Sequence, residues 1–185
     1  MTTAEIRWFF GETVSFDSLM QSFSFSEPSK RVDYYLLNTG VQLGVKWREG
    51  SLEAKQQQGV SQSYSNGQLE GEIACWKKWS FALDERETYS DNLAEQPQHW
   101  LAVHKQRQQV HDGCQLEVTY LTLRKRAYTT LGLEAFGSER SPRQNLMATI
   151  GYLLESGNLE GLDLSLRSSN NYAHWIHTNF NNTTS

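Results

Sequence analysis

Three cationic side chains lie close together in a short segment whose polar and apolar residues alternate as in a β-hairpin. Lys46 and Arg48 are two residues apart on its first arm, and Lys55 shares a face with Glu53 on its second arm, across a Glu49-Gly50 turn. Side chains on a strand alternate between its two faces, so each pair points the same way. Lys and Arg are rarely buried without partners. The hairpin therefore presents either a solvated face, which its neighbour Glu53 also favours, or a face that lines a cavity for an anion.

Other charged side chains suit the same chemistry. The further candidate phosphate-binding residues are Arg31, Lys78, Lys105 and Arg107, and the candidate metal-binding residues are Glu5, Glu117 and Glu134. Guanidinium and ammonium groups bind phosphate oxygens, whereas carboxylates bind hard cations such as Mg²⁺ or Mn²⁺. A closed barrel could bring both sets around a polyphosphate and a divalent cation. Salt bridges across the barrel would equally account for the carboxylates. No nucleophile elbow or glycine-rich phosphate loop is recognisable, so the catalytic residues are unassigned.

The elements that must position these residues are mostly strands. Beside the two arms of the hairpin, period-two alternation of apolar and polar residues marks runs near 6–10, 31–36, 68–79, 98–110, 114–124 and 127–136. Turn residues bound these runs, and the connections are short, which implies antiparallel pairing. The pattern predicts a mainly β (α+β) fold: an antiparallel barrel or tunnel of about eight strands with flanking helices.

Three helices are predicted beside the strands. A short one covers 15–23, with Thr13 or Ser15 as its cap. A longer one over 142–156 begins with Ser141, Pro142 and Gln144, a capping-box start, and we expect it to pack outside the barrel. The last covers 171–179, whereas 84–97 reads as a long polar loop with some helix.

Length, net charge and cysteine content indicate the number of domains, the class of partner and the localisation. We expect one domain over 1–180 and a polar tail at 181–185, in a chain of 185 residues. The formal charge of −4 does not favour a nucleic-acid partner. No signal peptide or membrane-spanning apolar run is recognisable. Cys75 and Cys114 are expected to be reduced thiols. Together these features predict a cytoplasmic protein. The oligomeric state is left open.

The order of these residues resembles the CYTH domain, or triphosphate tunnel metalloenzyme superfamily, over most of the chain. The matching segments are Glu5-Ile6-Arg7, Arg31-Val32-Asp33-Tyr34-Tyr35, Lys46-x-Arg48 with Lys55, Lys105-x-Arg107, and the late carboxylates Glu117 and Glu134. The resemblance implies an eight-stranded antiparallel tunnel that acts on triphosphates, polyphosphate or nucleotides with Mg²⁺ or Mn²⁺. It also implies that the cations hold the phosphates and that the three carboxylates carry the metal.

Two positions depart from the family's pattern. The opening signature, Glu-x-Glu-x-Lys in the family, reads Glu5-Ile6-Arg7-Trp8-Phe9 here, and the late Glu-x-Glu reads Glu134-Ala135-Phe136. Losing two carboxylates and gaining Arg7 lowers the negative charge that could hold a divalent ion. We therefore expect phosphate binding to be retained and the metal site to be impaired.

Three functions remain open from the sequence. The first is a charged tunnel that binds a phosphorylated polyanionic small molecule, with degenerate metal-dependent triphosphatase activity undecided. The second is the same tunnel as a non-catalytic anion-binding module. The third is a lipocalin-like barrel for an apolar ligand, which the abundance of aromatic residues favours. The polarity of the barrel interior separates the third from the others, and metal dependence separates the first two.

Overall fold

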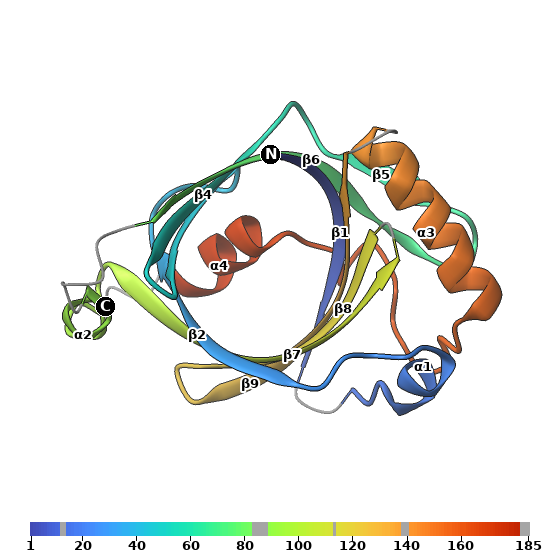
Figure 1. Ribbon diagram of the computed structural model, residues 1–185, viewed down its shortest axis with the longest axis horizontal. Coiled ribbons are helices and arrows are strands. Elements are labelled where there is room, and N and C mark those ends of the chain that lie inside the picture. Colours follow the sequence, from blue (N-terminus) through green and yellow to red (C-terminus); the bar gives the residue numbers. More distant parts are fainter. Residues whose placement is uncertain (12–13, 83–88, 113, 138–140, 182–185) are drawn as a thin grey trace.

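The computed structural model is a closed antiparallel β-barrel with helices around and inside it (Figure 1). Eight strands follow one another around the ring in the order β1-β9-β8-β7-β2-β3-β4-β6, and pairing of β6 with β1 closes it. The structure describes the whole chain except residues 12–13, 83–88, 113, 138–140 and 182–185. The mainly β, eight-stranded barrel predicted from the alternation is thus confirmed.

The bounds of the elements follow. The strands are β1 (Thr2–Phe10), β2 (Ser29–Leu36), β3 (Leu43–Arg48), β4 (Ser51–Gln57), β5 (Gln62–Ser65), β6 (Glu70–Ala82), β7 (Trp100–Asp112), β8 (Cys114–Leu123) and β9 (Arg126–Phe136). The helices are α1 (Asp17–Ser22), α2 (Tyr89–Ala94), α3 (Pro142–Ser156) and α4 (Tyr172–Phe180).

The pairing register aligns charged positions across the ring. Glu5 on β1 lies opposite Glu134 on β9, and Lys46 on β3 lies opposite Glu53 on β4. The β3–β4 turn is the predicted Glu49-Gly50 pair, in which both residues have positive φ, 46° and 77°. Two positive φ angles are what a tight hairpin turn requires, and Gly supplies one of them without steric cost.

The outward faces of β1, β6, β8 and β9 contribute to an apolar core outside the ring. Ile6 and Trp8 of β1 are fully buried, against a core that includes Leu146 and Ile150 of α3 and Leu19 of α1. Figure 1 shows α3 and α1 outside the ring, beside β1 and β8. The outward apolar face of β1 leaves its charged face, with Glu5 and Arg7, inside the barrel.

A second apolar core fills part of the interior. The helix α4 lies within the ring of strands in Figure 1. Its residues Trp175, Ile176 and Phe180 pack on inward side chains of the barrel. The Trp175 ring stacks on Phe9, with the ring centroids 4.4 Å apart. The interior is therefore divided into an apolar part that α4 occupies and a remaining charged part.

The helices agree in part with the sequence predictions, and one short strand was not expected. The capping box of α3 is confirmed, and α4 begins directly after its cap, Asn171. The helix predicted over 15–23 is shorter, because α1 covers Asp17–Ser22 and its N-cap position is Phe16, without a side-chain cap. Strand β5 (Gln62–Ser65) was not predicted, since its residues show no apolar alternation.

Parts of other predictions lie outside the described residues. These are Thr13, residues 84–88 of the predicted loop, and 182–185 of the tail. Cys75 and Cys114 are free thiols. Among the helices that the structure describes, none has the length and hydropathy of a transmembrane segment.

Candidate functional site

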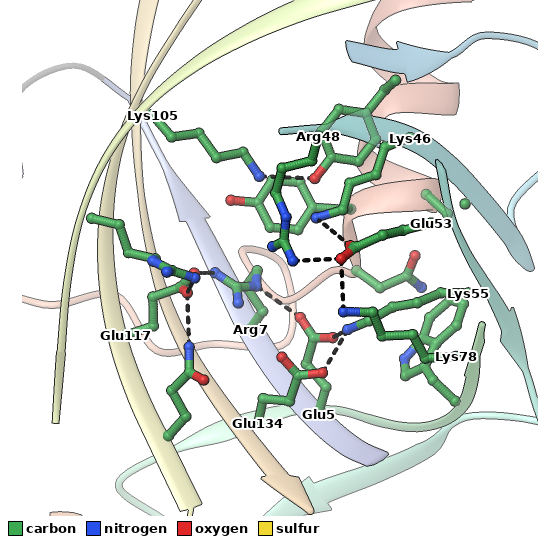
Figure 2. Close-up of a pocket in the computed structure, with 18 of the residues that line it drawn as sticks. Glu5, Arg7, Lys46, Arg48, Glu53, Lys55, Lys78, Lys105, Glu117 and Glu134 are labelled. Carbon is green, nitrogen blue, oxygen red and sulfur yellow. Dashed lines mark hydrogen bonds and ion pairs between the residues drawn. The ribbon is translucent and has the colours of Figure 1, made fainter. Parts of the chain in front are cut away.

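The part of the barrel interior that α4 leaves open is a cavity of about 500 Å³ (Figure 2). All ten charged residues selected from the sequence line it: Glu5, Arg31, Lys46, Arg48, Lys55, Lys78, Lys105, Arg107, Glu117 and Glu134. With Arg7, Glu49 and Glu53 added, the described lining holds eight cationic and five carboxylate side chains. The cavity is thus cationic in a chain whose formal charge is −4. The convergence is observed, and the individual phosphate and metal roles remain predictions.

The charged face of the β3–β4 hairpin lines this cavity. Glu53 is only 4% exposed and accepts hydrogen bonds or ion pairs from three cations. These are Lys46 at 3.3 Å, Lys78 at 3.0 Å and Arg48. The solvated-face interpretation of the hairpin is therefore wrong, because its charged face is turned into the barrel.

Arg7 lies at the centre of the acidic part of the cavity. Its Nε donates to Glu5 at 2.8 Å, and its Nη1 donates to Glu117 at 2.9 Å and to the Thr130 hydroxyl at 2.9 Å. The side chain is 4% exposed, and its guanidinium lies 4.8 Å from the centre of the Tyr172 ring. Arg7 is thus held by two carboxylates, a hydroxyl and an aromatic face.

A glycine makes that position possible. Gly132 on β9 lies opposite both Arg7 on β1 and Glu117 on β8, so Arg7 passes over it to reach Glu117. A Cβ at Gly132 would lie 2.5 Å from the Arg7 Cζ. Any other residue there would occupy the space of the guanidinium.

Glu117 is the most densely contacted carboxylate. Beside Arg7 it accepts hydrogen bonds from Gln109, Gln115 and Thr119, and it pairs with Arg107 at 3.4 Å. Burial alone would raise the pKa of Glu117, but the surrounding cations, Arg7 first among them, lower it to about 2. Glu117 is therefore a fixed negative charge at neutral pH.

The opposite wall is organised around Asp33, which is fully buried. Lys105 lies 2.9 Å from it, Arg31 3.0 Å and Lys46 3.3 Å. Lys105 also donates to the Tyr35 hydroxyl at 2.8 Å. Despite burial, which acts the other way, these cations hold the pKa of Asp33 well below its usual range.

Several cations of the cavity lack sufficient compensating charge. Burial lowers the pKa of Lys46 to about 8; Asp33 opposes the shift and Lys105 contributes to it. Burial likewise lowers the pKa of Lys105 and of Arg107, and the Arg107 Nε has no hydrogen-bond partner. A lowered pKa in a base means that its environment disfavours positive charge. An anion placed in the cavity would relieve that cost.

The three candidate metal ligands do not form a divalent-cation site. Arg7 lies between Glu5 and Glu117, and Lys55 contacts Glu134 at 2.6 Å and Glu5 at 3.5 Å. Within the described part of the chain, no group of three or more His, Cys, Asp or Glu side chains is placed to hold a metal ion. Mg²⁺ requires close octahedral oxygen coordination, and each of the three carboxylates already pairs with a cation through at least one oxygen. The residues present therefore do not fit a resident Mg²⁺ or Mn²⁺.

Some residues of the cavity were not selected from the sequence. Asp33 and Glu53 alternate with the selected cations on β2 and β4, so strand periodicity could have identified them. Tyr172 lines the cavity from α4, and Gly132 shapes it from β9. Neither carries a local signal, because both act through a long-range arrangement.

Comparisons with known proteins support the fold. No protein-family model and no curated protein matches the chain. A putative adenylate cyclase from Bacillus halodurans has a similar structure, with a TM-score of 0.52 and 13% identity over 97% of this chain and 98% of that one. The triphosphatase of the mimivirus capping enzyme has a TM-score of 0.50 and 8% identity over 83% of this chain and 88% of that one. Identities this low establish the fold alone, so the chain shares the barrel fold of these two proteins.

Proposed function

We propose that the chain binds a phosphorylated polyanionic small molecule, of the triphosphate or polyphosphate type, in the barrel cavity. The observation that carries this proposal is the excess of cations over carboxylates around a cavity of about 500 Å³. A triphosphatase with the same fold supports the class of ligand. The cavity offers charges for several phosphate groups at once, because its cations come from different strands of one ring.

The cations of the cavity differ in exposure. Lys55, Arg48, Arg107 and Lys78 keep 25%, 23%, 21% and 19% of their side chains accessible. Lys46 and Arg31 keep 15% and 12%, and Lys105 and Arg7 keep 4% each. The accessible cations are therefore assigned to direct phosphate contact. Arg48 and Arg107 would present paired N–H donors to phosphate oxygens, and the lysines would act as compact point charges.

The interior disfavours the apolar-ligand alternative. The apolar part of the barrel is filled by α4, which stacks Trp175 on Phe9. The space that remains is lined by many ion-paired side chains beside a few aromatic ones, and an apolar ligand there would bury charges without offering them partners. The charged lining therefore disfavours the lipocalin-like function.

Ligand-induced stabilisation tests the proposal. Tripolyphosphate at about 100 times its Kd should stabilise the protein by about 2.7 kcal/mol, which raises Tm by about 5–10 °C in a chain of this size. The double variant Lys55→Ala, Arg107→Ala should lose that shift. Lys77→Ala is the matched control, because Lys77 is the exposed neighbour of Lys78 on β6 and lies outside the cavity lining. An equal loss in Lys77→Ala, or no shift in the unmodified protein, would refute cavity binding.

Phosphate release in the same samples separates binding from turnover. We expect no sustained release of phosphate from tripolyphosphate with Mn²⁺, because the carboxylates are occupied by Arg7 and Lys55. Mn²⁺-dependent turnover that Glu134→Gln abolishes would instead establish the metal-dependent triphosphatase.

A further inference from the structure

We infer that Arg7 takes the place of a divalent cation in this cavity, so that the ligand is bound in its metal-free form and Mg²⁺ competes with the protein for it. The inference rests on the proposed function and specifies the state of the ligand. It follows from how the carboxylate oxygens are used, from the fixed position of Arg7 and from the charge balance of the lining.

The carboxylate oxygens are already engaged. Glu5 uses one oxygen for Arg7 and directs the other at Lys55. Glu117 uses one oxygen for Arg7 and Thr119 and the other for Arg107 and two glutamine amides. A divalent ion at either residue would have to displace a buried cation and lie beside its positive charge.

The guanidinium of Arg7 is locked in place. It crosses β9 directly above Gly132, where even a methyl group would collide with it at 2.5 Å. The Tyr172 ring covers it, 4.8 Å from ring centre to Cζ, and Thr130 accepts one of its hydrogens. A side chain held on this many sides does not swing away to admit a metal.

The charge balance then determines the preferred ligand. The described lining has eight cations and five carboxylates, and the buried Asp33 behind three of these cations adds a sixth carboxylate. The surplus is therefore positive before any ligand binds. Mg²⁺ bound to a polyphosphate cancels negative charge on the ligand, and a less negative ligand gains less from a cationic cavity. The opposite holds for a metalloenzyme, in which the metal bridges phosphate and carboxylates.

Calorimetric titration of tripolyphosphate into the unmodified protein tests this, once with EDTA and once with excess MgCl₂, at matched ionic strength. We expect binding in EDTA and an apparent affinity lower by about tenfold or more in Mg²⁺. Equal affinity in both buffers, or binding only with Mg²⁺, overturns the inference and leaves the proposed function standing. No binding in either buffer refutes the proposed function itself.

Glu134→Gln gives a second test, in which the affinity for tripolyphosphate is expected to rise. Glu134 pairs with Lys55 at 2.6 Å and keeps 18% of its side chain accessible. Removal of its charge should free Lys55 for phosphate and strengthen binding in EDTA severalfold, about two- to tenfold. If Glu134 carried a metal, the same change would weaken binding in Mg²⁺ and leave binding in EDTA unaffected. That pattern would contradict the inference.

Discussion

The dependence of Arg7 on Gly132 gives a sharp test of how the cavity is built. In Gly132→Ala the new methyl group would lie 2.5 Å from the Arg7 Cζ and 2.5 Å and 2.7 Å from its two terminal nitrogens. A flexible side chain could move aside cheaply, but Arg7 is tied to Glu5, Glu117 and Thr130. We expect a loss of about 1–3 kcal/mol in the free energy of unfolding from overpacking, and more where an ion pair breaks.

A double-mutant cycle isolates the contact. Arg7→Met should itself cost about 3–5 kcal/mol, because it leaves Glu5 and Glu117 with fewer buried partners. In that background the guanidinium is gone, so Gly132→Ala should cost little, and the coupling between the two changes should be about 1–3 kcal/mol. Gly151→Ala in α3 is the matched control, since nothing lies within 4 Å of its added Cβ. It should stabilise the protein by about 0.5–1 kcal/mol.

Urea unfolding followed by fluorescence of the six tryptophans gives all four free energies. If Gly132→Ala is as harmless as Gly151→Ala, the Arg7 side chain moves aside without cost and does not depend on the glycine. If Gly132→Ala costs the same with and without Arg7, the glycine is needed for a reason other than the guanidinium.

Three further predictions follow from the charged and apolar halves of the barrel. The affinity for tripolyphosphate, measured by calorimetry, should fall as pH rises through about 8, because Lys46 then loses its proton. Lys46→Arg should remove this pH dependence, and an affinity of the unmodified protein that does not change with pH would contradict the prediction. The folded-state pKa of Glu117 is below its ordinary 4.5, so its stabilisation is present above pH 4.5 and is lost as pH falls toward about 2. That loss is about 3 kcal/mol, and urea midpoints of Glu117→Gln should depend less on acid than wild type. Trp175→Ala should cost about 3–5 kcal/mol in urea unfolding, whereas a loss under 1 kcal/mol would show that α4 does not hold the barrel together.

The sequence predicted the barrel because strand alternation is a local property. On β1 the outward Ile6 and Trp8 alternate with the inward Glu5 and Arg7, so the sequence already separates the two faces. Repetition of this pattern along eight runs, with short turns between most of them, predicted antiparallel closure. The convergence of the ten charged residues follows from closure, since one face of every strand then points to the same space.

Local periodicity could not predict what enters that space. The helix α4 was expected, yet its position inside the ring depends on Trp175 meeting Phe9, more than 160 residues away in the chain. In the sequence, Glu53 favours a solvated hairpin, because a Glu between cations has the same pattern on a surface and in a buried network. Only the positions of Lys46 and Lys78 in three dimensions distinguish the two.

The two halves of the interior differ in what they contribute to stability. Around α4 the barrel fills its interior with apolar side chains, which stabilise the fold through burial. The other half buries ion pairs around Arg7 and Asp33, although such pairs are often no more stabilising than apolar residues of similar volume. The charged half therefore adds little stability that an apolar filling would not supply. Its surplus of positive charge is what the proposed anionic ligand would compensate.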